Sequence, residues 1–401
     1  MRDTFLECMR RIAFTALFAL ALITSSAQAA GLDQTCELTA TRFDADTVNV
    51  LFPDSSAQYW TASYRAVPGT HIRIDGVFPH ARYMSWNVYD PLLRPFTHTY
   101  DQQLVPNADD PQRYTLYITF DPGFKPGPNV LYVDPSKNPA GEFTYRVYVP
   151  NKGRDITGGV GLPQVTWQPN SEGAPAFVSP CRDLEKPSVS TVTPLYAQQD
   201  GPETGLPMPG RPTPVWHKFT NLCQAGDDLF FDNPYGDNIP DSGQSPCSNF
   251  GEGGFLSNMD NAYVYTGISR GYGRVLVIHG KAPTFGLTGK QLRYWSFCQN
   301  DPYTQRYIAC LRDDQVKLGK DGFYTIVVSR PSDRPKCAKN WLPWGPQPWG
   351  TLIYRHMLPD PAFSGAIQRA SYGSEKTSMG DYYPAAHYAT PAAPRSRQAP
   401  C

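Results

Sequence analysis

The stretch RYMSWNVYD, residues 82–90, recurs in the chain as RYWSFCQND, residues 293–301. Arg, Tyr, Ser and Asp stand in register in the two copies, and the offset from 82 to 293 is 211 residues. A repeat with such a long period marks a structural unit that is used twice. We therefore expect two copies of one fold in this chain.

Further pairs of segments extend the repeat on both sides of this stretch. They are NVLYVDP (129–135) with NWLPWGP (340–346) at an offset of 211, residues 145–150 with 354–359 at 209, and Gly76…Pro79 with Gly280…Pro283 at 204. The rise of the offset from 204 to 211 predicts seven additional residues in the second copy, near residues 285–291.

Short segments of alternating apolar and polar residues recur through both copies. Residues 59–65 and 71–76, for example, are separated by the turn signal Pro68-Gly69. Many short strands with Pro and Gly turns between them are typical of sandwiches and barrels. The sequence therefore predicts an all-β protein with two tandem homologous antiparallel β-sandwich domains, jelly-roll-like in topology, joined by a long Pro/Gly-rich connector.

Composition places the boundaries of these parts. Residues 168–260 are crowded with Pro, Gly, Ser, Asp and Asn, which predicts an extended connector, and long loops often carry function. The expected parts are a signal peptide (1–29), a first sandwich (30–167), the connector (168–260), a second sandwich (261–360), and a short helix with a disordered tail (361–401).

The first residues have the pattern of an export signal. Arg2, Arg10 and Arg11 precede an apolar run over 12–23 and the small-residue site Ala27-Gln28-Ala29. This pattern predicts a signal peptide that is removed near Ala29, and hence a periplasmic or secreted protein. The apolar run is too short to span a bilayer, and no later stretch is long and apolar enough, so we expect no transmembrane segment.

Charge and motif content exclude several classes of function. Lys+Arg and Asp+Glu are equal at 36 each, and no basic stripe is present, which argues against a nucleic-acid partner. The chain has neither C-x-x-C nor H-E-x-x-H. The acidic residues over 227–241 lack the spacing of a calcium loop. We therefore predict no metal and no cofactor.

Eight cysteines remain after the signal peptide, an even number that favours disulfides in an exported protein. At the offset of 211, Cys298 aligns with Asn87 and Cys310 with Thr99, so both cysteines are absent together from the first copy. This predicts a Cys298–Cys310 bond across a hairpin. The remaining pairs are expected to be Cys223–Cys247 by proximity, and Cys36–Cys181 and Cys337–Cys401 by elimination.

The repeated stretch also supplies the first candidate site. Arg82, Arg293, Asp90 and Asp301 could line a pseudo-symmetric cleft between the copies, in which paired carboxylates about 5–10 Å apart would do acid–base work. His80, at the entrance of the first stretch, is a third acid–base candidate. The alternative is structural: each charged residue pairs with a neighbouring strand or caps a turn.

Aromatic side chains are the second theme. Trp86, Trp344 and Trp349 are candidates for a platform that binds sugar rings, although part of this aromatic content has to be core. The glycine-rich run 153–161 could hold an anion beside Arg154.

At its repeated motifs the chain resembles a class of uncharacterised secreted bacterial proteins. These are marked by an aromatic strand of the pattern (Y/W)-S-x-x-x-Y-D, an N-x-L strand and a closing aromatic strand that ends in Pro. The resemblance covers both copies and not the connector. It implies a jelly-roll-like domain and carries no activity.

These observations favour an exported protein that binds a ligand or a surface, such as a glycan, another extracellular polymer or a small molecule, between the two copies. A periplasmic or extracellular hydrolase that uses Asp90, Asp301 or His80 is the first alternative. A structural protein of the cell envelope is the second. An enzyme needs titratable groups that converge in a concave pocket, whereas a binding module can work with a flat aromatic strip.

Overall fold

The computed structural model describes residues 34–38, 42–43, 49, 51–168, 210–221, 224–225, 253–254, 256–302 and 304–389. These residues form a mostly β structure with four sheets. The predicted signal peptide and most of the predicted connector lie outside the described residues. No helix among the described residues is long and apolar enough to cross a membrane.

The first half of the chain contains two sheets that enclose a core. Their orders are β2-β3-β9-β5-β6 and β1-β10-β4-β7-β8. The strands are β1 (Gln34–Glu37), β2 (Arg42–Phe43), β3 (Ala57–Arg65), β4 (His71–Val77), β5 (Ala81–Tyr89), β6 (Pro95–Tyr100), β7 (Arg113–Thr119), β8 (Val130–Tyr132), β9 (Ala140–Pro150) and β10 (Gln164–Gln168).

The second half repeats this arrangement. Its sheets have the orders β11-β12-β18-β14-β15 and β17-β16-β13-β19. The elements are β11 (His217–Lys218), β12 (Asn261–Ser269), β13 (Val275–Lys281), β14 (Leu292–Asn300), β15 (Tyr307–Arg312), β16 (Phe323–Ser329), η4 (Pro331–Asp333), β17 (Asn340–Pro343), β18 (Trp349–Pro359), η5 (Ile367–Arg369), α4 (Glu375–Met379), η6 (Gly380–Tyr382) and β19 (Ala385–Ala389).

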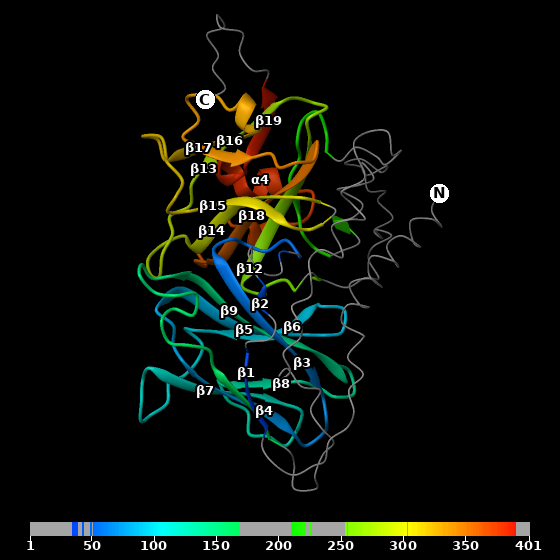
Figure 1. The fold of residues 1–401 in the computed structure, drawn as a ribbon, viewed down its shortest axis with the longest axis vertical. Coiled ribbons are helices and arrows are strands. Elements are labelled where there is room, and N and C mark those ends of the chain that lie inside the picture. Colours follow the sequence, from blue (N-terminus) through cyan, green and yellow to red (C-terminus); the bar gives the residue numbers. More distant parts are fainter. Residues whose placement is uncertain are drawn as a thin grey trace, which may run out of the picture.

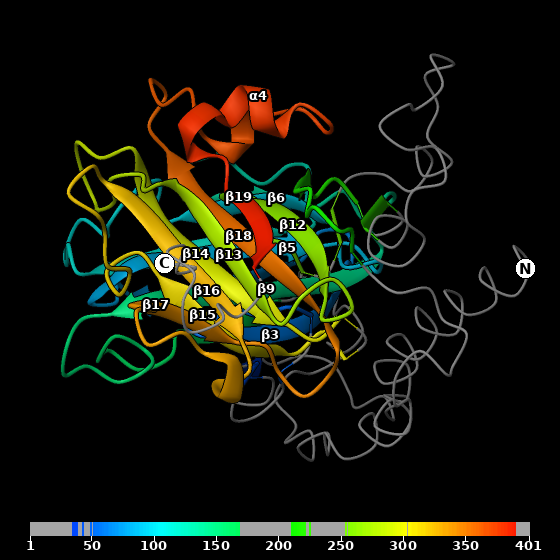
Figure 2. The same ribbon diagram turned by 90° about the horizontal axis from the view of Figure 1, so that it is seen from above.

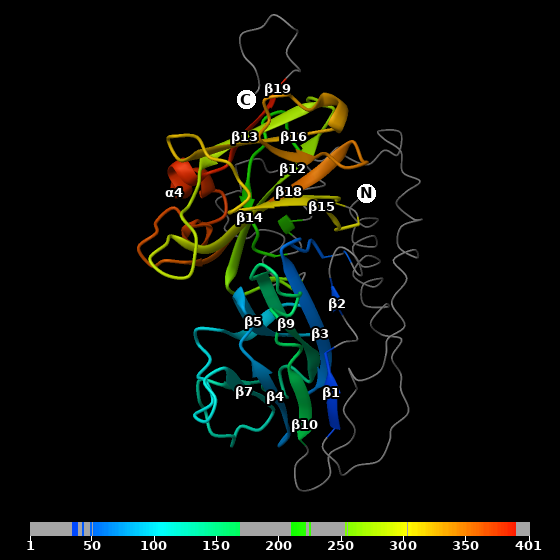
Figure 3. The same cartoon turned by 60° about the vertical axis from the view of Figure 1, so that its left-hand side comes forward.

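The two halves correspond strand by strand. In order along the chain, β3 to β10 match β12 to β19, and the repeated stretch of the sequence forms β5 and β14. The register agrees as well, since Trp86 faces Tyr145 in the first half and Phe297 faces Tyr354 in the second. Figures 1 and 3 show the four sheets stacked along the long axis, with the sheets that contain β5 and β14 in the middle.

The repeated asparagines hold the same loop in both halves. The amide of Asn129 accepts from the backbone N–H of Val105 and donates to the carbonyls of Val105 and Thr115. Asn340 makes the equivalent bonds to Lys317 and Thr325. The N-x-L motif is therefore repeated because each half uses the asparagine side chain to hold this loop against the neighbouring strand.

The repeated glycines make room for a tyrosine ring. A Cβ atom at Gly76 would clash with the ring of Tyr114, and one at Gly280 would lie 2.6 Å from the hydroxyl of Tyr324. Both tyrosines are fully buried in the cores of their halves. Glycine is needed where another group approaches the backbone this closely.

The end of the chain differs from the prediction of a disordered tail. Ile367 and Met379 pack into the second core, and β19 pairs with β13 as part of the outer sheet. Figure 2 shows α4 beside the strands at the edge of this half. Residues 390–401 lie outside the described residues.

The predicted Cys298–Cys310 disulfide is confirmed, with the two residues directly opposite each other on β14 and β15. Its counterpart in the first half is Asn87 opposite His98. The sequence alignment placed Thr99 there, one residue off, because the loop before β15 is one residue longer than the loop before β6. Such a bond is consistent with an oxidising compartment.

Cys337 is also disulfide-bonded. The side chains of the other five cysteines, Cys36, Cys181, Cys223, Cys247 and Cys401, lie outside the described residues. The predicted Cys223–Cys247, Cys36–Cys181 and Cys337–Cys401 pairings therefore lie outside them too.

Candidate functional site

The two halves meet through the outer faces of their middle sheets. Along β5, Met84, Trp86 and Val88 point into the first core, because side chains alternate along a strand. Tyr83 points the opposite way, and it packs with Tyr148, Tyr294 and neighbouring side chains in a separate apolar cluster between the halves. The repeated stretch therefore builds a sandwich core with one face and the contact between the halves with the other.

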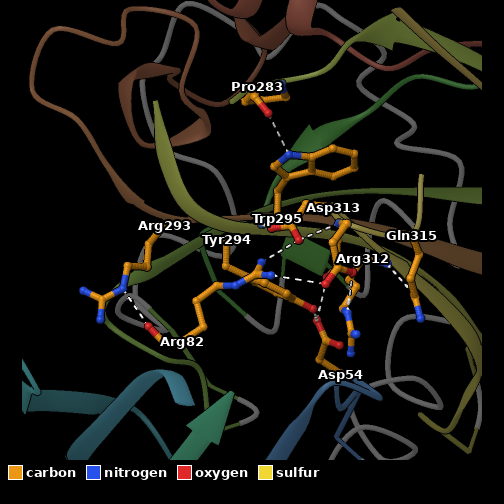
Figure 4. A network of polar contacts seen from close by, with 11 residues as sticks. Asp54, Arg82, Pro283, Arg293, Tyr294, Trp295, Arg312, Asp313 and Gln315 are labelled. Atoms are coloured by element: carbon orange, nitrogen blue, oxygen red, sulfur yellow. Dashed lines mark hydrogen bonds and ion pairs between the residues drawn. The ribbon is translucent and has the colours of Figure 1, made fainter. Parts of the chain in front are cut away.

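Reciprocal ion pairs cross this contact. Arg82 of the first half binds Asp313 of the second at 2.5 Å, and Arg293, the counterpart of Arg82, binds Asp101 at 2.6 Å. Nε of Arg293 also donates to the carbonyl oxygen of Arg82 at 2.8 Å. Burial raises the pKa of the Asp313 carboxyl, and the Arg82 guanidinium opposes this shift. The two arginines predicted to line a cleft are thus engaged with the opposite half (Figure 4).

The segment before β3 packs against the second half, and the segment before β12 packs against the first half. Asp54 accepts hydrogen bonds from the hydroxyls of Tyr294 and Ser296, at 2.9 Å and 2.5 Å. In the reciprocal contact, Asn258, the counterpart of Asp54, donates to the hydroxyl of Tyr83 at 3.0 Å, and this hydroxyl donates to Asp260 at 2.5 Å. Asp260 also contacts His98 at 3.0 Å. Burial and the Asp260 charge raise the pKa of Tyr83.

A buried arginine of each half donates a hydrogen bond to the segment that comes from the other half. Arg146 donates to the carbonyl oxygen of Leu256 at 2.5 Å, and Arg355 donates to that of Phe52 at 2.6 Å. Phe52 and Leu256 both have φ of 53°, a left-handed conformation that is uncommon for bulky residues. Polar groups of the two halves therefore bond across their contact in the reciprocal pattern of a two-fold interface.

Each of the candidate carboxylates belongs to the loop at its own strand end. Asp90 accepts from the backbone N–H groups of Leu92 and Arg94, and it forms an ion pair with the Arg94 guanidinium at 2.6 Å. Asp301 accepts from the backbone N–H of Thr304 in the corresponding loop. Both carboxylates thus hold the hairpin loops at the ends of their own strands. This agrees with the structural role that the sequence offered as the alternative, in which each charged residue caps a turn.

His80 is exposed just before β5. Its backbone N–H donates to the carbonyl oxygen of Gly158, and its own carbonyl accepts from Asn151. Arg154 is also exposed, and its side chain lies against Gly159 in the glycine-rich run. These contacts tie the run to the start of β5.

The candidate tryptophans are buried. Trp86 and Trp344 belong to the first and second cores with 0% and 1% of their surface exposed, and Trp349 is 5% exposed. The indole of Trp86 donates to the Tyr114 hydroxyl at 3.1 Å. These rings fill the interior, so a sugar ring has no open indole face to stack on at these three positions.

A different set of rings lies on the outer sheet of the first half. His71 on β4, Tyr117 on β7 and Phe124 in the following loop are half-buried and pack together, with centroid distances of 4.9 to 5.7 Å. Tyr132, on the adjacent edge strand β8, is 45% exposed. We call these four residues the ring platform. The alternation of His71, Ile72, Arg73, Ile74 and Asp75 was the sequence signal for an outward polar face here.

Hydrogen-bonding groups stand on the same face beside the rings. Arg73 binds Asp75 at 2.9 Å, and the hydroxyl of Thr115 donates to the same carboxylate at 2.8 Å. The side chain of Arg73 is 42% exposed and that of Asp75 is 29% exposed. The face therefore combines apolar rings with accessible charged donors and acceptors.

The corresponding face of the second half carries different side chains, and its exposed ring, His279, stacks on Phe323 away from the positions of His71 and Tyr117. Val275, Val277, Val327 and Ala338 are buried there in an apolar cluster, against which Trp341 packs. The guanidinium of Arg334 lies 4.6 Å from the Trp341 ring. The ring platform is thus a property of the first half that the shared fold does not require.

Two further features have some of the elements of a site. Asp54, Cys298 and Cys310 offer possible metal ligands within 4.8 Å of one another, but the two sulfurs are bonded to each other and are not thiolates. The second feature is a small cavity with a volume of about 20 Å³, which suits a water molecule. It is lined by Gly210, Arg211, Val215, His217, Tyr265, Thr266 and Gly267.

Comparison with solved structures shows a likeness in fold to bacterial proteins. An uncharacterised protein from Burkholderia cenocepacia aligns with a TM-score of 0.51 and 13% identity, over 88% of this chain and 85% of that chain. A protein from Vibrio parahaemolyticus aligns with a TM-score of 0.44 and 12% identity, over 84% and 90%. No family model and no curated protein matches the chain. The match to the Burkholderia cenocepacia protein confirms, for the fold alone, the expected resemblance to an uncharacterised bacterial protein.

Proposed function

We propose that this is an exported, periplasmic or secreted binding protein that holds a glycan chain on the ring platform of its first half. We further infer that its halves are homologous jelly-roll-like sandwiches that arose by duplication. The observation that carries the proposal is the packing of His71, Tyr117 and Phe124 into one group of rings beside the exposed Tyr132. The contact between the halves is filled, so the proposed surface lies on the outer sheet.

The chemistry of a sugar ring fits this face. A pyranose has apolar C–H faces that pack on aromatic rings, and its hydroxyl groups need hydrogen-bond partners. Arg73 and Asp75 supply charged donors and acceptors beside the rings. Charge-assisted hydrogen bonds of this type are stronger than neutral ones and are geometrically selective. A row of partly exposed side chains on neighbouring strands suits a polymer that lies across the strands.

The test measures the retention of the full chain on immobilised polysaccharides, including peptidoglycan. Replacing Tyr132 or Tyr117 with Ala should weaken binding by about tenfold, because each change removes ring contact area. Leu318→Ala is the matched control, since Leu318 is 50% exposed in the second half and Tyr132 is 45% exposed in the first.

Equal binding by the Tyr132→Ala and Leu318→Ala variants would count against the platform, as would the failure of every polysaccharide to retain the native chain. The same samples are assayed for new reducing ends. Their release would favour the hydrolase alternative over a binding protein.

A further inference from the structure

Two arginines of the second half approach one carboxylate, and a third arginine lies close to them. Arg270 and Arg274 lie in the loop between β12 and β13. Arg330 is the first residue after β16, and its Nη2 donates to the carbonyl oxygen of Pro346 at 3.3 Å. Asp333 on η4 lies 3.8 Å from the guanidinium of Arg270 and 3.7 Å from that of Arg274. We call these three arginines, with Asp333, the arginine cluster.

Several N–H groups of Arg270 and Arg274 make no hydrogen bond to Asp333. Distances of 3.7 and 3.8 Å are too long for N–H···O hydrogen bonds. Nε of Arg270 is buried and has no hydrogen-bond partner among the described residues. Burial lowers the pKa of the Arg270 guanidinium, the nearby Arg330 and Arg274 lower it further, and Asp333 acts in the opposite direction. One carboxylate thus lies near two guanidinium groups, and Arg330 adds a third positive charge beside Arg270.

The first half shows that the fold does not need these charges. Its loop between β3 and β4 has the same five-residue length and carries Ala66 and Thr70 at the places of Arg270 and Arg274. Phe120, the first residue after β7, corresponds to Arg330, the first residue after β16. The same loops are therefore built without any arginine, which leaves the cluster without a structural reason.

The loop over residues 330–339 strengthens the positive field. It also carries Arg334, Lys336 and Lys339, all exposed, whereas Asp333 is its one acidic residue. This accumulation occurs in a chain whose formal net charge is zero. A local excess of one sign raises the concentration of the opposite ion at the surface.

We propose that the arginine cluster is a binding site for a phosphate group. Guanidinium groups bind oxyanions through planar pairs of N–H donors, and forks from two loops match the several oxygens of a tetrahedral phosphate better than a single carboxylate. Asp333 holds the arginines in place and limits the affinity by repulsion. This site is independent of the ring platform and of the function proposed for it.

The test measures the affinity of the full chain for inorganic phosphate by calorimetry. Arg274→Gln should weaken binding by about tenfold or more, because a charge-assisted contact is lost. Arg274→Lys should recover only part of it, since lysine keeps the charge and loses the fork. Asp333→Asn should strengthen binding, because the repulsion is removed. Arg274 has 66% side-chain exposure, so its substitution should leave the fold intact.

Arg113→Gln in the first half is the matched control, because it changes the net charge equally and Arg113 has 58% side-chain exposure. Equal losses for Arg113→Gln and Arg274→Gln would overturn the site in favour of a net-charge effect. Weaker binding by Asp333→Asn, or no binding by the native chain, would also overturn it.

A second arm compares binding to vesicles of phosphatidylglycerol and of phosphatidylcholine. Binding to phosphatidylglycerol that depends on Arg274 identifies a headgroup phosphate as the source. Binding of inorganic phosphate alone identifies a soluble one.

Discussion

Glu142 is a buried carboxyl whose protonation responds to pH near neutrality. Burial raises its pKa from 4.5 to about 7. Glu142 stands opposite Tyr89, and the corresponding place in the second half, opposite Asn300, holds Thr351. A carboxyl is therefore not needed by the fold at this position, and its ionisation costs stability.

Glu142→Gln should stabilise the protein at pH 8 and have little effect at pH 4. Between pH 4.5 and 7 the folded state holds a proton that the unfolded state has lost, so stability falls as pH rises through this window. A shift of this size corresponds to about 3 kcal/mol at pH 8. Urea unfolding at both pH values checks the prediction, and an equal gain at both would contradict it.

His356 provides an internal reference for this pH series. Burial lowers its pKa from 6.5 to about 3, so its contribution to stability is present above pH 6.5 and is lost as pH falls toward 3. This effect has the opposite sign and is common to the native chain and the Glu142→Gln variant. The difference between the two chains therefore isolates Glu142.

At the scale of an element, the β14–β15 hairpin shows what the sequence could predict. Cys298 and Cys310 are absent together from the first copy, and residues that bond directly across a hairpin are expected to be gained or lost as a pair. The alignment paired Cys310 with Thr99 and not with His98, because the loop before β15 is one residue longer than the loop before β6. The pattern of apolar and polar residues in the strands does not show this difference in loop length.

Replacing both Cys298 and Cys310 with Ala should lower the free energy of unfolding by about 3 kcal/mol, because their bond closes a loop with a sequence separation of 12. Urea unfolding followed by tryptophan fluorescence measures the change. Both chains are also compared under reducing conditions, where the difference should nearly vanish. A difference that persists there would mean that side-chain packing and not the bond stabilises the hairpin.

The β19 strand shows where local sequence reasoning fails. Its residues, Ala385–Ala389, have low strand propensity, and its partner β13 begins at Val275, more than a hundred residues earlier. The local sequence of such a short Ala-rich segment predicts a disordered tail. It becomes a strand because it can pair with the edge of the sheet at β13. Tertiary pairing decides its structure.

At the scale of the whole molecule, the two halves are joined by contacts between residues far apart in sequence. Arg82 and Asp313 are 231 positions apart, and nothing in either segment specifies the other. The repeat predicted two similar halves, and the structure adds that their middle sheets exchange charged partners. The sequence could not show whether the candidate cleft exists, because that depends on how the two middle sheets pack against each other.

Arg82→Met should lower the free energy of unfolding more than Arg293→Met. Removing Arg82 leaves Asp313, whose side chain is 0% exposed, without its ion-pair partner, whereas removing Arg293 leaves Asp101 with 18% exposure to water. The loss of one partner from a buried pair costs about 3–5 kcal/mol. Urea unfolding followed by fluorescence and by near-UV circular dichroism measures both the size of the effect and whether the halves still unfold together.

The double variant Arg82→Met with Asp313→Leu separates the ion pair from the packing around it. An apolar pair of similar volume often replaces a buried ion pair without loss, so this variant should recover much of the stability lost in Arg82→Met. We expect a single unfolding transition in the native and double-variant chains, and two separated transitions in Arg82→Met, because the unpaired Asp313 weakens the contact between the halves. A single transition at unchanged stability in Arg82→Met would show that the reciprocal ion pairs do not couple the two halves.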